Sequence, residues 1–345
     1  MSENIEEEKQ ENTENSELYE HYRFEVDPGQ EALRIDKFLM SKIMNATRNK
    51  IQQATKAGNV LVNEKIVKSN YRVRPNDVIT IVLTYPPRET TIYGEDIPLD
   101  VVYEDADLIV INKQAGMVVH PGHGNFTGTL LHALKFYFEQ KNEAAEAMLV
   151  HRIDKDTTGL IVVAKNELAQ ARLAKQFFNH SIERKYQAIV WGDLDEEQGT
   201  IEGHIGRNPS NRLQMKVFPD GEQGRHAVTH YRLVKRYGYV SLIECQLETG
   251  RTHQIRAHMR HLGHPLFNDE RYGGDQILKG TTFSKYRQFI NNCFKLLPRQ
   301  ALHAKSLGFI HPTTQKEILF ESELPKDMAQ VVEKWEIYSQ HVKEQ

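Results

Sequence analysis

The feature that most constrains the fold is a series of short apolar runs that recur between residues 101 and 322. They have the length of β-strands, and few stretches show the 3.6-residue period of a helix. The runs are VVY (101–103), LIVI (108–111), GLIVVA (159–164), YQAIVW (186–191), VTHYRLV (228–234), VSLIECQL (240–247) and EILFES (317–322). Helical patterns cover 128–139, 166–179, 252–262 and 325–338. Many strands with a minority of helices predict an α+β domain built on a mostly antiparallel sheet, over about residues 100–338.

Charge is distributed unevenly along the 345 residues, and the formal net charge of −3 hides this. Residues 1–20 hold eight glutamates and one lysine, whereas residues 33–88 hold eleven lysines and arginines against three acids. Residues 89–345 are close to neutral. The acidic stretch 1–20 is expected to be a disordered tail, and the basic segment permits a polyanionic partner.

Composition and the chain's start exclude several classes of protein. No apolar run approaches the roughly 18 residues that a membrane-spanning helix needs, so no membrane partner is expected. The first residues are acidic and polar, unlike a secretory signal. Cys245 and Cys293 can form neither a disulfide framework nor a four-cysteine zinc site. We therefore expect a cytoplasmic protein without a metal.

The basic segment has the pattern of a small α/β module over residues 33–83. Apolar residues at 33, 35, 38, 39 and 43 predict a short amphipathic helix, and a second helix is expected from Thr47 to Gly58. Residues 60–67 predict two short strands around an Asn-Glu turn, and residues 77–83 predict a further strand. The proline-marked stretch that follows predicts a linker over residues 84–99.

Two segments of the large domain concentrate reactive side chains. In HRIDKDTTGL (151–160) a polar loop leads directly into an apolar strand, and a rigid strand holds such a loop well for chemistry. The alternative is an ordinary turn in which Asp154 or Asp156 caps backbone amides. The second segment, GRTHQIRAHMRH (250–261), predicts a helix with Thr252 as its N-cap, where Arg251 and the helix N-terminus would attract a phosphate.

The histidines of the second segment also invite a metal hypothesis. The candidate ligands are His253, His258, His261, His264 and Asp269. The chain lacks the HExxH pair of a zinc hydrolase, and His258 with His261 leaves a ligand set incomplete. No metal site is therefore predicted. A third segment, RQALHAKSLGF (299–309), predicts only a strand and is assigned to core packing.

Together these segments resemble the RluA-type pseudouridine synthase family. The likeness rests on HRIDKDTTGL, GRTHQIRAH (250–258), KYQAIVWG (185–192), VVHPGHGN (118–125), HPLFNDERYGG (264–274) and RQALHAKSLGF. The basic module is similar to the S4 RNA-binding domain through RIDKFL (34–39), TRNKIQQATKAG (47–58), VLVNEK (60–65) and PNDVI (75–79). The resemblance therefore implies a pseudouridine synthase catalytic domain behind an N-terminal S4-like domain.

The family reaction isomerises uridine to pseudouridine within RNA and needs no cofactor. The resemblance implies 23S ribosomal RNA as the substrate, in the stem-loop that bridges the two ribosomal subunits. It assigns Asp154 as the essential carboxylate, which could attack C1′ as a nucleophile or remove the C2′ proton as a base. Arg256 would pair with Asp154 and keep it ionised, and Tyr186 would stack on the extruded uracil.

The resemblance and the charge pattern also suggest which residues contact RNA. Those of the large domain are Arg152, Arg251, His253 and Gln254, and those of the small domain are Arg34, Lys37, Arg48 and Lys50. The expected partner of a monomeric enzyme is 23S ribosomal RNA or a large-subunit precursor particle. Two alternatives stay open: a non-catalytic S4-domain RNA-binding or assembly factor, and a metal-dependent hydrolase that uses the histidines.

Overall fold

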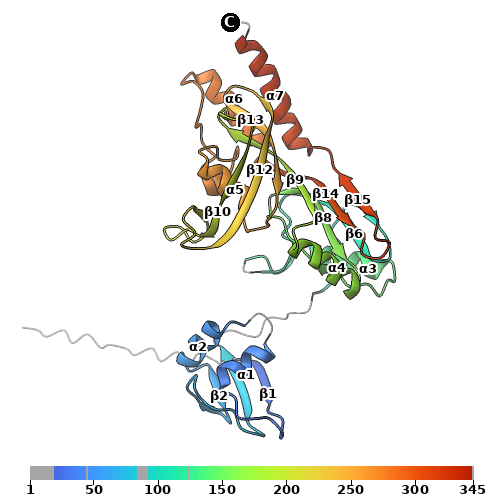
Figure 1. The fold of residues 1–345 in the computed structure, drawn as a ribbon, viewed down its shortest axis with the longest axis vertical. Coiled ribbons are helices and arrows are strands. Elements are labelled where there is room, and N and C mark those ends of the chain that lie inside the picture. Colours follow the sequence, from blue (N-terminus) through green and yellow to red (C-terminus); the bar gives the residue numbers. More distant parts are fainter. Residues whose placement is uncertain (1–18, 44–45, 84–91, 123, 344–345) are drawn as a thin grey trace, which may run out of the picture. The chain divides into compact units, whose positions relative to one another are not determined.

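The computed structural model describes residues 19–43, 46–83, 92–122 and 124–343, and the chain divides after Thr91 into two compact units. Figure 1 shows the smaller unit in blue and the larger one from green to red. None of the helices in these ranges is long and apolar enough to cross a membrane.

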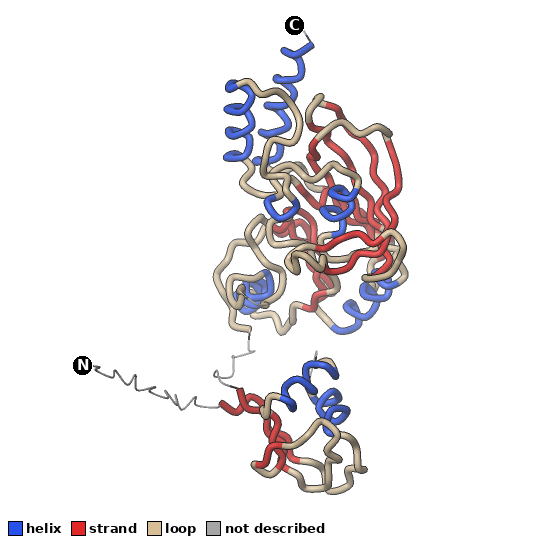
Figure 2. The backbone as a smooth tube through the Cα atoms, turned by 90° about the vertical axis from the view of Figure 1, so that its left-hand side faces the viewer, coloured by secondary structure: helices blue, strands red, loops and turns tan. Residues whose placement is uncertain are grey.

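The small unit is a four-stranded antiparallel sheet with two helices, as Figure 2 shows. The strand order is β1-β4-β2-β3, with β1 at Tyr19–Glu25, β4 at Val78–Leu83, β2 at Val60–Val62 and β3 at Lys65–Ile66. Helix α1 (Ile35–Lys42) buries Ile35, Phe38 and Leu39, which have the spacing of one helix face. Helix α2 (Arg48–Lys56) begins after Thr47, whose side chain accepts a hydrogen bond from the Lys50 amide.

Both ends of this unit differ from the sequence prediction. Strand β1 was not predicted, and it starts at Tyr19, so the last two residues of the proposed tail 1–20 are paired with β4; residues 1–18 lie outside the described residues. The proposed linker 84–99 is shorter at its far end, because Ile97 and Leu99 pack on the core of the large unit. Residues 84–91 are outside the described ranges.

The large unit is built on an eleven-stranded sheet that is mostly antiparallel, as predicted. Its main path has the order β11-β10-β12-β13-β9-β14-β8-β6-β5, with β15 paired to β14 and β7 to β8. Only β8 and β14 are parallel among the pairs formed by described residues. The strands are β5 (Val101–Glu104), β6 (Leu108–Lys113), β7 (Met148–Leu149), β8 (Thr158–Ala164), β9 (Glu183–Trp191), β10 (Gln198–Arg207), β11 (Met215–Phe218), β12 (Arg225–Arg236), β13 (Val240–Leu247), β14 (Leu302–Ile310) and β15 (Glu317–Glu321).

Helices cover parts of this sheet. Helix α4 (Glu167–Phe178) lies against β8, and α5 (Gln254–His261) lies beside β10, β11 and β12 (Figure 1). The others are α3 (Leu130–Gln140), the short 3₁₀ helix η1 (Glu270–Tyr272), α6 (Ser284–Leu296) and α7 (Lys326–Lys343). The sequence predicted α3, α4, α5 and α7. Helix α6 was missed, although Tyr286, Ile290 and Cys293 on its buried face have helical spacing.

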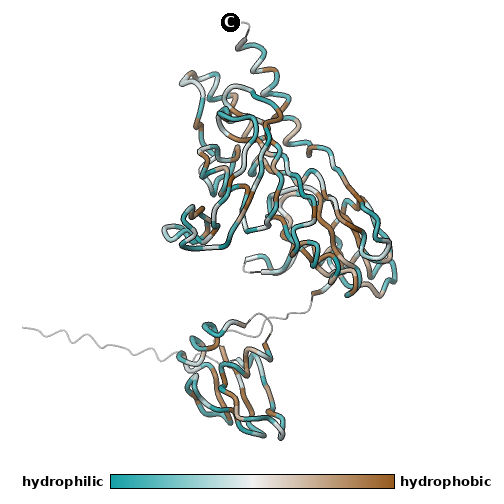
Figure 3. Tube along the Cα trace, viewed as in Figure 1, coloured by the Kyte–Doolittle hydropathy of each residue, from teal (hydrophilic) through white to brown (hydrophobic). Residues whose placement is uncertain are grey.

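Strands β10 and β11 were missed for a different reason. The buried face of β10 includes Gly203, where a Cβ would lie 2.7 Å from Cγ1 of Val217 on β11. A glycine there makes room for the neighbouring strand, but it adds no apolar side chain to the alternating pattern. Figure 3 shows hydrophobic residues, in brown, along the strands of the large sheet as well as on its helices.

Candidate active site

A cavity of about 510 Å³ opens where the loop before β8, the end of α4, strand β9 and the start of α5 meet. This volume lies in the usual range for a ligand site. Its lining combines the two segments that the sequence analysis singled out, which lie about a hundred residues apart in the chain. Among the lining residues are Arg152, Asp154, Tyr186, Arg251, His253, Gln254 and Arg256.

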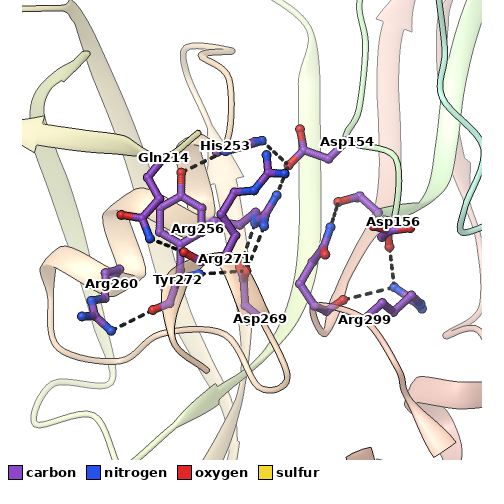
Figure 4. Close-up of polar contacts among 12 residues, drawn as sticks. Asp154, Asp156, Gln214, His253, Arg256, Arg260, Asp269, Arg271, Tyr272 and Arg299 are labelled. Atoms are coloured by element: carbon purple, nitrogen blue, oxygen red, sulfur yellow. Dashed lines mark hydrogen bonds and ion pairs between the residues drawn. The ribbon is translucent and has the colours of Figure 1, made fainter. Parts of the chain in front are cut away.

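The centre of the site is an arginine held between two carboxylates, as Figure 4 shows. Arg256 donates from Nη1 to Oδ2 of Asp154 at 3.0 Å. Its Nε and Nη2 donate to both oxygens of Asp269, at 2.7 and 2.8 Å. Because Asp269 occupies the planar fork of the guanidinium, Arg256 has a fixed direction toward Asp154.

The two carboxylates differ in their access to solvent. The side chain of Asp269 is 1% exposed, whereas that of Asp154 is 19% exposed at the cavity. Burial alone would lower the pKa of Arg256, but the bond and charge of Asp269, followed by those of Asp154, raise that pKa above its usual value. Arg256 is therefore a permanent cation that positions Asp154. Asp269 had been considered only as a metal ligand, so the sequence analysis missed this role.

Buried basic residues fix the backbone of the loop that carries Asp154. Lys113 Nζ donates to the Lys155 carbonyl at 2.9 Å and to the carbonyls of Gln114 and Met117. Arg299 Nη1 donates to the Asp156 carbonyl at 3.0 Å. Segment 299–309 was assigned to core packing, and Leu302 and Ala304 do pack there, but Arg299 also supports the loop. A loop held at successive carbonyls presents Asp154 in one geometry.

Tyr186 lies on β9 and forms part of the cavity wall together with Asp154. Burial raises the pKa of its phenol, and Arg184 opposes this shift more than the charge of Asp154 adds to it. The phenol is therefore protonated near neutral pH and can donate a hydrogen bond. His151 is a structural residue: its Nε2 accepts from the Val162 amide at 3.0 Å, and burial lowers its pKa to about 3.

Helix α5 begins one residue later than predicted. The N-cap is His253, in the left-handed region at φ 53°, and Thr252 is exposed. His253 Nδ1 contacts the Tyr272 hydroxyl at 2.9 Å, and Nε2 lies 3.9 Å from Oδ2 of Asp154. Burial lowers the pKa of His253 to about 4, so this side chain is neutral near pH 7 and adds no charge beside Asp154.

The predicted RNA contact Gln254 is corrected by the structure. Its side chain is buried, and Nε2 donates to the Val228 carbonyl and to the Thr229 hydroxyl. Its Oε1 accepts from Thr249 and from the Arg251 amide. All of its hydrogen-bonding capacity is used inside the protein, so Gln254 holds the turn before α5 in place and is not available to RNA.

Two further predicted RNA contacts, Arg152 and Arg251, line the cavity. Arg152 is exposed at the cavity and forms no hydrogen bond or ion pair with the described part of the chain. Arg251 also lines the cavity and is half-buried, and its Nε donates to the His226 carbonyl at 2.9 Å.

In the small unit, the four predicted RNA contacts fall into two pairs. Arg34 and Arg48 both bind the carboxylate of Asp36, whose side chain is fully buried. Lys37 and Lys50 are exposed on α1 and α2. Part of the predicted basic face is therefore committed to an internal ion pair, while the two lysines remain directed to solvent.

The histidines of 250–264 do not form a cluster with liganding geometry among the described residues. The group that does have it is Asp105, Asp107 and His311. There His311 Nε2 contacts Asp105 at 2.7 Å, and Nδ1 accepts from the amides of Thr313 and Thr314. Both ring nitrogens of His311 are thus engaged within the protein.

Comparison with known proteins assigns both units of the chain to families. Residues 107–261 match the family model described as RNA pseudouridylate synthase, and residues 33–79 match the S4 domain. An uncharacterized RNA pseudouridine synthase of Chlorobaculum parvum is 47% identical over 90% of this chain and 96% of its own length. Ribosomal large subunit pseudouridine synthase D of Escherichia coli O6:H1 is 40% identical over 89% and 92%. The solved human RNA Pseudouridylate Synthase Domain Containing 4 shares the fold, with a TM-score of 0.53 at 24% identity, over 69% of this chain and 93% of its own.

An S4 domain joined to this catalytic fold defines an RNA-modifying isomerase. The chain belongs to the RNA pseudouridine synthase family, in its RluA-type branch. The predictions of fold class, family and enzyme class are thereby confirmed.

Proposed function

We propose that this enzyme converts uridines of 23S ribosomal RNA, in the stem-loop that bridges the ribosomal subunits, and that Asp154 is its essential carboxylate. The choice of RNA is supported by several relatives that are about 40% identical over most of their length and named for the large ribosomal subunit. The same proposal places the enzyme in the cytoplasm, where it acts as a monomer on ribosomal RNA or a large-subunit precursor particle.

The role of Asp154 is supported by one observation above all. The Asp154 side chain accepts one hydrogen bond, from Arg256 on Oδ2, and it is partly exposed in the cavity lining. A carboxylate with one oxygen free of hydrogen bonds could bond to C1′ as the uracil departs, or remove the proton from C2′. On either route Arg256 orients the carboxylate and Tyr186 lines the place of the turning base.

The remaining steps of the reaction require only binding, orientation and proton transfer by side chains. Glycosidic cleavage, rotation of the uracil and bonding of C5 to C1′ leave the oxidation state unchanged, so the side chains must bind, orient and move protons. The protonated phenol of Tyr186 is a flat surface for the extruded base, since flipped bases are held by stacking. At the end C5 loses its proton and N1 gains one, so the number of protons is unchanged, and Asp154, the carboxylate of the cavity lining, can accept the proton from C5.

A pseudouridine map of ribosomal RNA tests this proposal. Cells that lack the protein should lose pseudouridine at a few positions of 23S RNA, and the wild-type gene should restore them. Asp154→Asn should restore none, while Asp156→Asn, in the same loop, should restore all. An unchanged 23S map would reject the substrate, and full rescue by Asp154→Asn would reject the assignment of the carboxylate.

The non-catalytic alternative predicts the opposite pattern. An RNA-binding assembly factor would restore ribosome assembly equally well with the wild-type protein and with Asp154→Asn, and the modification map would not change. The fixed position of Asp154 in the cavity favours the enzyme.

A further inference from the structure

Arg184 is a lining residue of the cavity to which the proposed mechanism gives no role. It lies on β9 two residues before Tyr186, so both side chains leave the same face of the strand, about 7 Å apart along it. Its residue surface is only 7% exposed. A guanidinium is seldom buried to this extent without a partner.

No carboxylate neutralises this cation within the described residues. Arg184 forms one hydrogen bond, from Nη2 to the Glu248 carbonyl at 3.2 Å, and its buried Nε has no partner. Burial lowers the pKa of Arg184, which shows that the surroundings disfavour its charge. Burying an uncompensated charge is costly, so such an arrangement needs a compensating anion from elsewhere.

The neighbours of Arg184 hold the guanidinium at a set position. Its Cζ lies 5.4 Å from the ring centroid of Phe177, on the wall formed by α4. On the other side, a Cβ at Gly250 would lie 2.8 Å from Nη1, so the absence of a side chain at this position gives the fork its room. Figure 4 shows Arg256, another arginine of the cavity lining, engaged by carboxylates.

The charge of the cavity lining favours an anionic ligand. Four arginines line it, namely Arg152, Arg184, Arg251 and Arg256, against one carboxylate, Asp154. Arg256 is already neutralised by Asp154 and Asp269. A planar fork with free N–H groups matches the oxygens of a phosphodiester, which RNA supplies at every nucleotide.

We propose that Arg184 binds a backbone phosphate next to the uridine whose base lies against Tyr186. The buried cation and the aromatic wall on the same strand then hold two parts of one flipped segment, its backbone and its base. This inference requires only that the substrate is RNA; it depends neither on 23S RNA as the target nor on the role of Asp154.

The test combines a protein variant with removal of one phosphate charge. Binding of a stem-loop RNA that the wild-type enzyme modifies is measured by fluorescence anisotropy at fixed salt. Two test RNAs carry a neutral methylphosphonate in place of one phosphodiester, either at the linkage 5′ of the target uridine or at the linkage 3′ of it. The ribose next to the altered linkage is 2′-O-methylated, and the control RNA carries the same methylated ribose with an ordinary charged phosphodiester. Arg184→Gln is expected to weaken binding of the charged RNA by roughly 10- to 100-fold. Neutralising one of the two linkages should weaken wild-type binding similarly, with no further loss when both changes are combined.

Lys185→Gln is the matched control, because Lys185 is the next residue on β9, lies on the opposite face and pairs with Glu183. The Lys185→Gln variant should lose as much affinity as the wild type does when the linkage is made neutral. If the losses from Arg184→Gln and from each neutral linkage simply multiply, Arg184 acts on the uracil or on the fold and the proposal is wrong. An Arg184→Gln variant that binds the charged RNA as tightly as wild type would also overturn it.

Discussion

Asp36 in the small unit and Asp154 in the large unit are both held by arginine, and the difference between them shows what makes such a pair structural or reactive. Asp36 in the small unit is fully buried and receives donors from Arg34, Arg48 and Gln52 on its two oxygens. Asp154 in the large unit is partly exposed and receives one donor, from Arg256. A carboxylate whose oxygens are both satisfied stabilises its fold, whereas one with a free oxygen at a cavity can react.

The second difference lies in the arginines. Arg34 and Arg48 are 39% and 50% exposed, so water can solvate them if Asp36 is lost. Arg256 is buried and shares its fork with Asp269, so neither partner can be solvated in place. The comparison therefore predicts unequal costs for breaking the two networks.

The largest effect is expected from Arg256→Met. It leaves Asp269 as a buried charge without a charged partner, which should lower the free energy of unfolding of the large unit by about 3–5 kcal/mol. It also removes the group that orients Asp154, so kcat should fall by roughly 10²–10³-fold in whatever protein remains folded. Arg256→Lys keeps the positive charge but removes the planar guanidinium that binds Asp269 with two hydrogen bonds. If Arg256→Lys had the kcat of the wild type, the bidentate geometry would be unimportant for catalysis. Thermal unfolding and single-turnover kinetics measure the two quantities.

A smaller effect is expected when the structural pair is broken by Asp36→Asn. Because both arginines are part-exposed, the loss should be about 1–2 kcal/mol, confined to the small unit. Hydrogen exchange of amides in 19–43 and 46–83 measures it, and kcat on a short RNA should not change. A large loss of kcat would contradict the view that the large unit carries the chemistry independently of the Asp36 ion pair.

The same pair makes a pH prediction. Burial opposes ionisation of Asp36, but the bonds from Arg34, Gln52 and Arg48 outweigh it and hold its pKa well below the usual range. A lowered folded-state pKa contributes stability that is present above the unfolded value of about 3.9 and is lost as the pH falls through the folded value. Acid titration should therefore destabilise the small unit of the wild type more steeply below about pH 4 than that of Asp36→Asn. Identical slopes would rule out this linkage.

The smallest effect concerns the lysines that the structure leaves exposed. Replacing Lys37 and Lys50 with glutamine should reduce the slope of log affinity against log salt by about 1.4–1.8, at 0.7–0.9 per phosphate contact. The charge-conserving pair Lys37→Arg and Lys50→Arg should keep the wild-type slope. An unchanged slope in the glutamine variant would remove these two lysines from the RNA interface.

Much of this could be predicted from the sequence, and the failures have physical causes. Strands with large apolar residues were found, whereas β10 was missed because Gly203 fills a buried position without a side chain. Asp154, Arg256 and Tyr186 were named from a family resemblance, and the structure places them around one cavity. The role of Asp269 depends on a contact with a helix thirteen residues earlier, which no local pattern encodes. Gln254 was misassigned because polarity does not show that its partners are internal.

The central claim is that the partly free carboxylate of Asp154 carries the chemistry. Single-turnover conversion of a stem-loop RNA tests it most directly, with Asp154→Asn compared with Asp156→Asn. Both changes remove one charge from the same loop, but only Asp154 contacts Arg256. The account predicts no detectable pseudouridine with Asp154→Asn, undiminished RNA binding, and a rate close to wild type with Asp156→Asn. Conversion by Asp154→Asn at a rate similar to that of Asp156→Asn would contradict it.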